Sequence, residues 1–526
     1  MSVVNREQNK RLVAVHGWSG TLLGLLLYVV IITGAVAVFA HEIGVWSAGG
    51  TRSHHPLSQP INDRLVELSQ QVDPAYVEEV QVFANNSGLI SAFFHTHTQN
   101  ADGNLEDKGV RFFLDPNSLE IVDKQEGYRS SFPRDPASAL HTFIAILHIN
   151  LHIPRPWGLW ATGIVGFVML TAVVSGIILH KHLLQDIFVA PRLSSLLLNR
   201  RDRHLLSGSW SLPFGFVLSF TGIFFSFAGA LGLPIVAMVA FGGDQMKVME
   251  VITGTPPLVD ERPAPLANLD TIIADSKARN ISDPLSVVVN HWGRADAQVT
   301  LFHEAAGDAL TGRAHLFSGS TGDYLGVKPL LGTEESVGGF AVGLIGPLHF
   351  GNFGGLLSKV VWFALGIASA YVTITGLELW LARRREDVLW QRFDRARIVF
   401  QYGTPVALIG AGFGYFLSPS LGVTHSWTAA GFCLVAGLCF LPAFFMREER
   451  SLVRLLASVM GLGLILLPFV RMAASGVLWD SLFASGNALV IGVDLVLALS
   501  GIATLYLLFG LKQSEVVEAP QTIPAE

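Results

Sequence analysis

Eight apolar runs constrain what this chain can fold into more than any other feature. A helix needs about 20 residues to cross a hydrocarbon core of roughly 30 Å. The runs that reach this range are Leu12–Ala40, Trp157–Leu179, Leu205–Phe241, Val360–Ala382, Val399–Leu417, Trp427–Met446, Leu452–Val470 and Ala488–Leu511. We therefore expect an all-α polytopic membrane bundle of about eight transmembrane helices, since a helix satisfies its backbone hydrogen bonds inside lipid.

The placement of positive charges predicts the orientation of these spans. The chain has 51% hydrophobic and 14% charged residues, and 17 of its 35 Lys and Arg residues gather in four stretches. These are Arg6, Lys10 and Arg11; Lys181, Arg192, Arg200, Arg201 and Arg203; Arg383, Arg384, Arg385, Arg392, Arg395 and Arg397; and Arg447, Arg450 and Arg454. Because Lys and Arg are retained on the cytoplasmic side of short loops, both termini are expected in the cytoplasm. The expected location is a bacterial inner membrane.

Two long polar segments must then lie on the opposite, periplasmic side. The resulting division is transmembrane helix 1 (1–41), an outer domain (42–156), helices 2 and 3 with a basic loop (157–243), a second outer domain (244–357), helix 4 with a basic loop (358–397), helices 5 to 8 (398–511) and a cytoplasmic tail (512–526). Alternating apolar positions predict a small α+β domain in each outer segment. A hairpin is expected over 109–122, around Asp115-Pro116-Asn117-Ser118, with an echo over 313–326.

Histidines recur in register in the two halves of the chain. His16 is followed by Ser-Gly at 19–20 and Thr-Gly at 33–34, and His204 is followed by the same pairs at 207–208 and 221–222. Further on, His148 precedes Ser-Gly at 175–176, and His349 precedes Thr-Gly at 375–376. This pattern indicates an internal duplication in which each half is helix, outer domain, helix.

A histidine at the mouth of an apolar run is costly to bury, so its repetition points to a shared task. Ligation of haem iron needs two imidazoles from different helices at one depth, with small residues nearby. We expect His16 and His204 to form an inner pair and His148 and His349 an outer pair, with His180, His152 and His141 as reserve ligands. The alternative for any single histidine is a helix cap or an interfacial anchor. The two cysteines, Cys433 and Cys439, lie in one helix and offer neither a disulfide nor a thiolate site.

These residues also resemble a known family. The runs that carry the resemblance are Arg11-Leu-Val-Ala-Val-His16-Gly-Trp-Ser-Gly with Thr33-Gly34, Leu147-His148 with Ser175-Gly176-Ile-Ile-Leu-His180-Lys181, Asp202-Arg203-His204 with Leu212-Pro213 and Thr221-Gly222, and Leu348-His349-Phe-Gly351 with Thr375-Gly376. In this order they are similar to the PepSY-associated transmembrane family of bacterial iron-regulated inner-membrane proteins, over about residues 10–385. The last four helices depart from the four-helix pattern of the family.

The resemblance implies a haem b-containing reductase, with two haems, that passes electrons to a ferric siderophore and has PepSY-like domains outside the membrane. Reduction would release the metal, because oxygen-rich chelators hold Fe(II) poorly. No flavin or NAD site is seen, since no glycine-rich stretch follows a strand and opens a helix. The electron donor is then a quinol or a separate protein, and no nucleic-acid partner is expected. Helix 1 implies more than roughly 30 Å between the two haem layers.

Other readings stay open at this stage. The chain is alternatively a haem-free siderophore or iron transporter with the outer domains as receptors, since transporters are often built from repeats. His95 and His97 would share one face of a strand, either as a metal or ferric-chelate contact or, more commonly, as solvated polar residues. Glu378, Arg471 and Asp494 lie in or near the apolar runs, and Asp494 is a candidate proton or quinol contact.

Overall fold

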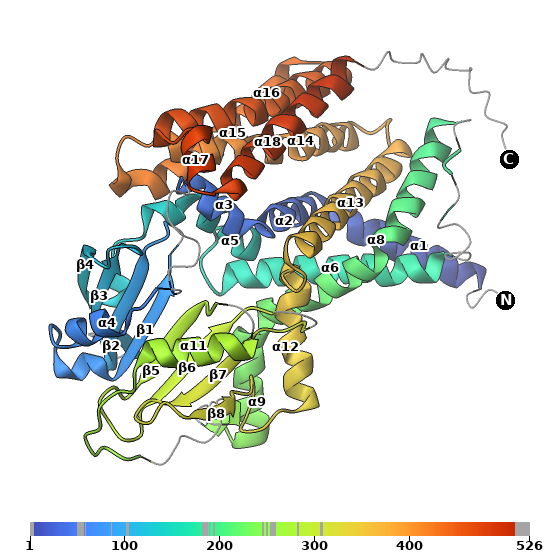
Figure 1. Cartoon of the computed structure of the whole chain (residues 1–526). Helices are drawn as coiled ribbons and strands as arrows, with labels where there is room; N and C mark the ends of the chain where they lie inside the picture. The colour runs from blue at the N-terminus through green and yellow to red at the C-terminus, as the bar shows by residue number, and fades with distance from the viewer. Residues whose placement is uncertain are drawn as a thin grey trace.

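The computed structural model describes residues 5–49, 57, 59–85, 87–100, 105–180, 188, 190–192, 195–244, 247–248, 251–252, 259–280, 283–305 and 309–510. Figure 1 shows a set of long helices with an antiparallel sheet at one end, and the start of α1 and the end of α18 lie away from the sheet. Lys181, His182 and the predicted tail 512–526 lie outside the described residues.

Six helices in the described part of the chain are long and apolar enough to cross a membrane. They are α6 (Trp157–Leu179), α8 (Leu196–Phe227), α13 (Gly355–Ala382), α15 (Thr424–Phe445), α16 (Glu449–Ser475) and α18 (Ala488–Phe509). A seventh results if α1 (Arg6–Leu22) and α2 (Gly24–Ala37) count as one span, although they are bent by 66°. The break falls at Leu23, whose backbone is not helical, and Gly24, a poor helix former, follows it. The chain is therefore a membrane protein with several spans.

The predicted eighth span, Val399–Leu417, lies within helix α14 (Val388–Phe416), which is not among the helices apolar enough to be assigned as spans. Its backbone packs closely on α15, because a Cβ on Gly410 or Gly414 would lie within 3 Å of that helix. Many α14 residues are buried, so protein rather than lipid surrounds much of it, and the helix needs fewer apolar side chains. The predicted run Leu205–Phe241 also differs, since α8 is followed by a π-helical turn at Ala228–Gly232 and by α9 (Leu233–Phe241).

Short helices lie between the sheet segments and the long helices: α3 (Ala40–Ser47), α5 (Ala139–Asn150) and α12 (Val337–Phe350). Another short helix, α17 (Trp479–Ala484), connects α16 and α18. The residues that follow two of these helices, Leu151 after α5 and Gly351 after α12, have φ of 57° and 68°. This left-handed conformation commonly ends a helix. His148 and His349 therefore lie on helices of their own just before α6 and α13.

The two outer segments form one eight-stranded antiparallel sheet. Its strands are β1 (Glu79–Ala84), β2 (Ile90–Gln99), β3 (Leu105–Leu114), β4 (Ile121–Tyr128), β5 (Ser286–Asn290), β6 (Gln298–His303), β7 (Arg313–Ser318) and β8 (Tyr324–Val327), in the spatial order β4-β3-β2-β1-β5-β6-β7-β8. Both predicted hairpins are present, as β3–β4 and β7–β8. The halves join where β1 pairs with β5, from Glu79 opposite Asn290 to Phe83 opposite Ser286.

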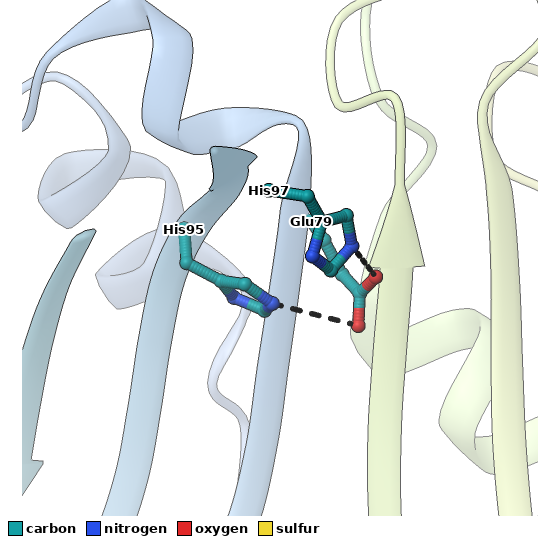
Figure 2. Close-up of side chains that lie close together, drawn as sticks. All are labelled: Glu79, His95 and His97. Atoms are coloured by element: carbon teal, nitrogen blue, oxygen red, sulfur yellow. Dashed lines mark hydrogen bonds and ion pairs between the residues drawn. The ribbon is translucent and has the colours of Figure 1, made fainter. Parts of the chain in front are cut away.

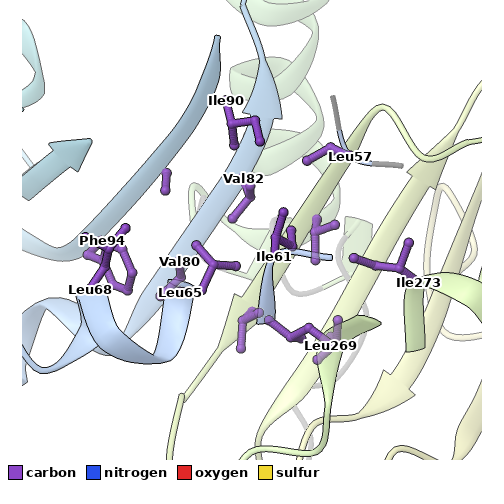
Figure 3. Close-up of a cluster of buried hydrophobic side chains, with 14 of the residues drawn as sticks. Leu57, Ile61, Leu65, Leu68, Val80, Val82, Ile90, Phe94, Leu269 and Ile273 are labelled. Carbon is purple, nitrogen blue, oxygen red and sulfur yellow. The ribbon is translucent and has the colours of Figure 1, made fainter. Parts of the chain in front are cut away.

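One hydrophobic core serves both halves of the sheet. Helices α4 (Asn62–Ser69) and α11 (Leu269–Asn280) lie on the same face, where Leu65 and Leu269 are fully buried (Figure 3). Each helix also caps the other: Asp270 Oδ1 accepts from the backbone N–H of Ile61 at 2.7 Å, and Asn62 Oδ1 accepts from that of Leu269 at 3.0 Å. The two domains predicted for 42–156 and 244–357 thus share a sheet and a core, because the unpaired edges of β1 and β5 satisfy each other.

The carboxylate of Asp494, a candidate proton or quinol contact by sequence, is fully occupied. Its Oδ2 accepts from Arg471 at 2.7 Å and Trp479 Nε1 at 2.9 Å, and its Oδ1 accepts from Trp46 Nε1 at 2.8 Å. Asp494 and Arg471 have no exposed surface. Because Trp46 belongs to α3 and the others to α16, α17 and α18, this cluster ties the last helices to the first half of the chain.

Asp494→Ala is expected to destabilise the protein by about 3 to 5 kcal/mol, because it leaves the Arg471 charge buried without a partner. Thermal unfolding of the purified protein in detergent measures the loss. The double variant with Arg471→Met and Asp494→Leu removes both charges and should recover most of it. Equal destabilisation of the single and double variants would show that the ion pair itself is not the cause.

Candidate functional site

The inner histidine pair predicted from the repeat is present. His16 lies on α1 and His204 on α8, and their ring centroids are 6.3 Å apart with an angle of 75° between the ring planes. The chain separates these residues by 188 positions, so packing of the two halves brings them together. Neither ring is fully buried in the protein.

The outer pair is present as well. His148 on α5 and His349 on α12 have ring centroids 6.1 Å apart and ring planes inclined by 36°. The ring of Phe225 packs against His349 at 5.3 Å from the other side. As in the inner pair, each half of the chain supplies one imidazole, and both rings keep some accessible surface.

Each imidazole of the inner pair is held through its Nδ1 by a different helix. His16 Nδ1 lies 3.0 Å from the carbonyl oxygen of Ala172 and 3.0 Å from Ser175 Oγ, both on α6. His204 Nδ1 lies 3.1 Å from the carbonyl oxygen of Val372 and 3.2 Å from Thr375 Oγ1, both on α13. A carbonyl oxygen only accepts, so Nδ1 carries the hydrogen and Nε2 of the neutral ring keeps its lone pair.

The outer pair is held in the same way. His148 Nδ1 donates to the carbonyl oxygen of Val30 on α2 at 2.9 Å. His349 Nδ1 lies 2.8 Å from Thr221 Oγ1 on α8, and this hydroxyl donates its own hydrogen to the carbonyl oxygen of Val217 at 2.7 Å. Thr221 therefore accepts from His349, and Nε2 is again the nitrogen with the lone pair.

A glycine lies beside every one of these rings, and at Gly34 and Gly376 a Cβ would come closer than an ordinary van der Waals contact. A Cβ would lie 3.5 Å from His16 Cε1 if placed on Gly176, 3.2 Å from His204 Cε1 on Gly376, 2.6 Å from His148 Cε1 on Gly34, and 3.5 Å from His349 Cε1 on Gly222. These glycines end four of the six Ser-Gly and Thr-Gly pairs that recur in the sequence, and the other two, Gly20 and Gly208, do not face a histidine ring. In three of these four pairs, the Ser or Thr before the glycine places its hydroxyl group near Nδ1 of the same histidine.

The four Nε2 atoms form no hydrogen bond with any residue that the structure describes. Two imidazoles with one metal ion midway between them have ring centroids about 6.2 Å apart, given metal–nitrogen bonds of about 2 Å and nitrogens about 1.1 Å from the ring centre. The observed separations of 6.3 and 6.1 Å match this value. Each pair therefore has the donor set and the spacing for one metal ion between two neutral imidazoles.

The reserve histidines lie in other settings. His152 Nε2 is engaged by the carbonyl oxygen of Phe143 at 3.0 Å, and the two rings stack. His141 contacts the hydroxyl of its neighbour Thr142. His180 follows the end of α6, and both its nitrogens are buried without a hydrogen-bond partner within the described chain.

The sequence did not predict which groups form hydrogen bonds with Nδ1 of the four histidines. The Ser-Gly and Thr-Gly pairs were visible as a repeat, but spacing along one helix does not reveal which histidine of another helix faces them. The carbonyl groups of Val30, Ala172 and Val372 carry no sequence signal at all. Glu378 on α13, which the sequence also singled out, pairs with Arg397 at 3.1 Å and Arg200 at 3.4 Å.

Comparison with known proteins agrees with the early resemblance. The family model described as the PepSY-associated TM region matches residues 13–383. An uncharacterized protein of Pseudomonas aeruginosa is 27% identical over 373 residues, which cover 68% of this chain and 91% of that protein. The match ends before α14, so the last helices lie beyond it. With more than half of its length matched, the chain belongs to the PepSY-associated transmembrane family.

Proposed function

We propose that the protein is a haem b-containing inner-membrane reductase that delivers electrons to a ferric siderophore in the periplasm. The observation that carries this proposal is the double pair of imidazoles: His16 with His204 and His148 with His349. Each pair has the separation that a shared iron requires, and each ring is fixed through Nδ1 with Nε2 left without a partner.

The surroundings of the pairs suit a large apolar cofactor. Haem b, when bound, would supply a one-electron couple at an iron that the two imidazoles of a pair would hold. A shallow groove of about 320 Å³ along α1 and α6 is lined by Leu12, Val15, Leu170, Thr171, Val174, Ser175 and Ile178, of which Ser175 lies 3.0 Å from His16 Nδ1. At the outer pair the rings of Phe225 and Phe350 stack beside His349. Such walls favour burial of a macrocycle by the hydrophobic effect.

The chain's own residues do two things in this mechanism. The hydrogen bonds to Nδ1 fix the tautomer and orientation of each ring and raise its basicity as a ligand. Helix α8 sets the spacing of the layers: it carries His204, and Gly222 on the same helix touches His349, so the layers lie about 27 Å apart at 1.5 Å per residue. This is slightly less than the sequence alone implies.

An aromatic pair lies between these two levels. Phe214 is on α8 between His204 and Gly222, and its ring packs edge-on against Trp362 at 5.5 Å. Trp362 Nε1 donates to the carbonyl oxygen of Leu348, next to His349, at 2.8 Å. An electron that moves between the two histidine pairs would therefore have an aromatic pair part of the way along its path.

The proposed reaction is balanced as a one-electron transfer. A donor protein would lose one electron for each chelated Fe(III) that becomes Fe(II), whereas a quinol would lose two electrons and two protons and reduce two ferric chelates in turn. Oxygen-rich chelators hold the resulting Fe(II) poorly. The orientation follows the positive charges, with both termini in the cytoplasm and the eight-stranded sheet in the periplasm.

The test is the absorption spectrum of the protein purified in detergent, oxidised and dithionite-reduced, with a pyridine haemochrome count. The expected result is a b-type reduced spectrum with about two haems per chain. After removal of dithionite, a ferric hydroxamate chelate should reoxidise the haems while ferrozine traps Fe(II). A folded protein without haem, expressed with haem precursor supplied, would contradict the proposal and favour transport of a siderophore.

The hydroxyl groups near Nδ1 give a graded prediction. Thr221→Val removes the only side chain or carbonyl seen bonded to His349 Nδ1, whereas Thr375→Val leaves the carbonyl of Val372 bonded to His204. Loss of such an orienting partner typically costs 10- to 100-fold in metal affinity, so about that loss of haem affinity is expected for Thr221→Val and a smaller one for Thr375→Val. Haem retention during dialysis against apomyoglobin measures both. Equal losses would show that the hydroxyls do not orient the rings.

A further inference from the structure

Outside the helices, three potential metal ligands meet on one face of the sheet. His95 and His97 lie two residues apart on β2, so their side chains point to the same side, and Glu79 on β1 is directly opposite His95. Figure 2 shows both imidazoles directed at the carboxylate of Glu79. The sequence indicated that the two histidines would share a face, but it gave no signal for Glu79.

His95 is buried and has one nitrogen without a hydrogen bond. Its ring has no exposed surface and stacks on Phe93 with centroids 4.3 Å apart. Nδ1 faces the carbonyl oxygen of Phe93 at 3.5 Å, while the buried Nε2 has no hydrogen-bond partner and lies 3.7 Å from Glu79 Oε1. Burying a polar atom without a partner costs free energy. A cation bound to this nitrogen, or a proton on it, would satisfy it.

His97 is held in place by a second carboxylate. Its Nδ1 lies 2.9 Å from Asp107 Oδ1 on β3, and Arg129 in turn bonds Asp107 Oδ2 at 3.1 Å. Its Nε2 lies 3.3 Å from Glu79 Oε2. An imidazole whose Nδ1 donates to a carboxylate and whose Nε2 points at other ligands is the usual arrangement of a metal-binding histidine.

The distances suit one ion. The ligand atoms of Glu79, His95 and His97 all lie within 4.8 Å of one another. Ligands about 2.1 Å from a tetrahedral ion are about 3.4 Å apart, so small side-chain shifts suffice to close the shell. We propose that Glu79, His95 and His97 form a binding site for a divalent transition-metal ion on the outer sheet, with Asp107 as a positioning residue.

The ligand types define the class of ion. Two imidazoles and one carboxylate favour first-row transition metals such as Zn²⁺, Co²⁺ and Fe²⁺, whereas Ca²⁺ and Mg²⁺ prefer oxygen ligands alone. Three protein ligands leave a tetrahedral ion one open position, and the 42% exposure of the His97 side chain places that position toward solvent. The site forms from strands β1 and β2 and does not depend on the histidine pairs between the helices.

Equilibrium dialysis of the full-length, haem-loaded protein in detergent against Zn²⁺ or Co²⁺, with the bound metal counted by mass spectrometry, tests the site. These ions are distinct from haem iron in the count. Glu79→Gln and His97→Ala should each bind about one zinc fewer per chain than the wild type, and Asp107→Asn should weaken binding 10- to 100-fold. The matched control is His291→Asn, which removes an imidazole from the second half of the sheet, where it pairs with Asp296.

Two readouts keep the result decisive. Zinc should raise the unfolding temperature of the wild type and of His291→Asn, and it should not raise that of Glu79→Gln, an isosteric change at a partly exposed residue. A zinc count that is the same in wild type, Glu79→Gln and His97→Ala would overturn the site and leave a hydrogen-bonded ion pair in its place. Zinc binding lost in all variants including His291→Asn would overturn it equally.

Discussion

The variant His349→Ala is expected to lose one haem of two and all reduction of ferric chelates, while the spectrum of the other haem stays largely intact. The outer pair consists of His148 and His349, at a centroid separation of 6.1 Å, so alanine would leave one imidazole to hold the iron. The inner pair is held by other helices, through Ala172 on α6 and Val372 on α13. The pyridine haemochrome count and the rate of Fe(II) trapping by ferrozine measure the two effects.

His152→Asn is the matched control for this variant. His152 is also at the outer end, but its Nε2 is occupied by the carbonyl oxygen of Phe143. Asparagine tolerates the left-handed backbone at this position, where φ is 57°. The control should keep both haems. Loss of all haem from His349→Ala, or of none, would contradict the assignment of the outer pair.

The sequence predicts that His16 lies near His204, because the spacing of His, Ser-Gly and Thr-Gly is the same in the two halves of the chain. Two copies of a helix with a histidine at the same position are expected to place it at the same depth, and His16 and His204 do meet. The partner helices were not predictable from spacing. Gly34 and Thr33 stand on the same helix pair as His16, yet Gly34 packs against His148 from another helix. Depth along a helix is a local property, whereas the neighbour across it depends on tertiary packing.

The same limit applies to the sheet. Alternating apolar residues and turn residues predicted the hairpins β3–β4 and β7–β8, whose contacts are local. The pairing of β1 with β5 joins residues more than 200 positions apart, and no periodicity encodes it. The two halves of the chain meet at this strand pair and again at the two histidine pairs between the helices.

The bend between α1 and α2 and the small residues of α14 show a second limit. Assigning spans from hydropathy treats each apolar run as one straight helix that is exposed to lipid. Leu23 breaks the first run, and α14 is covered by protein, so neither assumption holds there. Asp494 is a third case: as an isolated acidic residue it resembled a functional group, but Arg471, Trp46 and Trp479 satisfy it fully.

Gly34→Ala is expected to remove the outer haem although it changes no ligand. A Cβ on Gly34 would lie 2.6 Å from Cε1 and 2.9 Å from Nδ1 of His148. Carbon atoms do not approach so closely, and the ring cannot retreat without breaking its hydrogen bond to Val30 on the same helix. One methyl group therefore forces the imidazole away from the position that it shares with His349. The haem count should fall by one, and chelate reduction should fall with it.

Gly20→Ala is the matched substitution, because a Cβ at Gly20 meets no atom within 4 Å. Both glycines lie in the first helical pair, so any general effect of alanine on helix stability is favourable in the two variants alike. The two variants are therefore expected to differ only in the steric contact that Gly34→Ala makes with His148. If Gly34→Ala keeps both haems, the ring of His148 is not fixed against α2, and the glycine in the Thr-Gly pair serves helix packing alone. If Gly34→Ala loses one haem and Gly20→Ala loses none, Gly34 provides the space that the imidazole of His148 needs, and Gly376, where a Cβ would lie 3.2 Å from His204 Cε1, is expected to act in the same way.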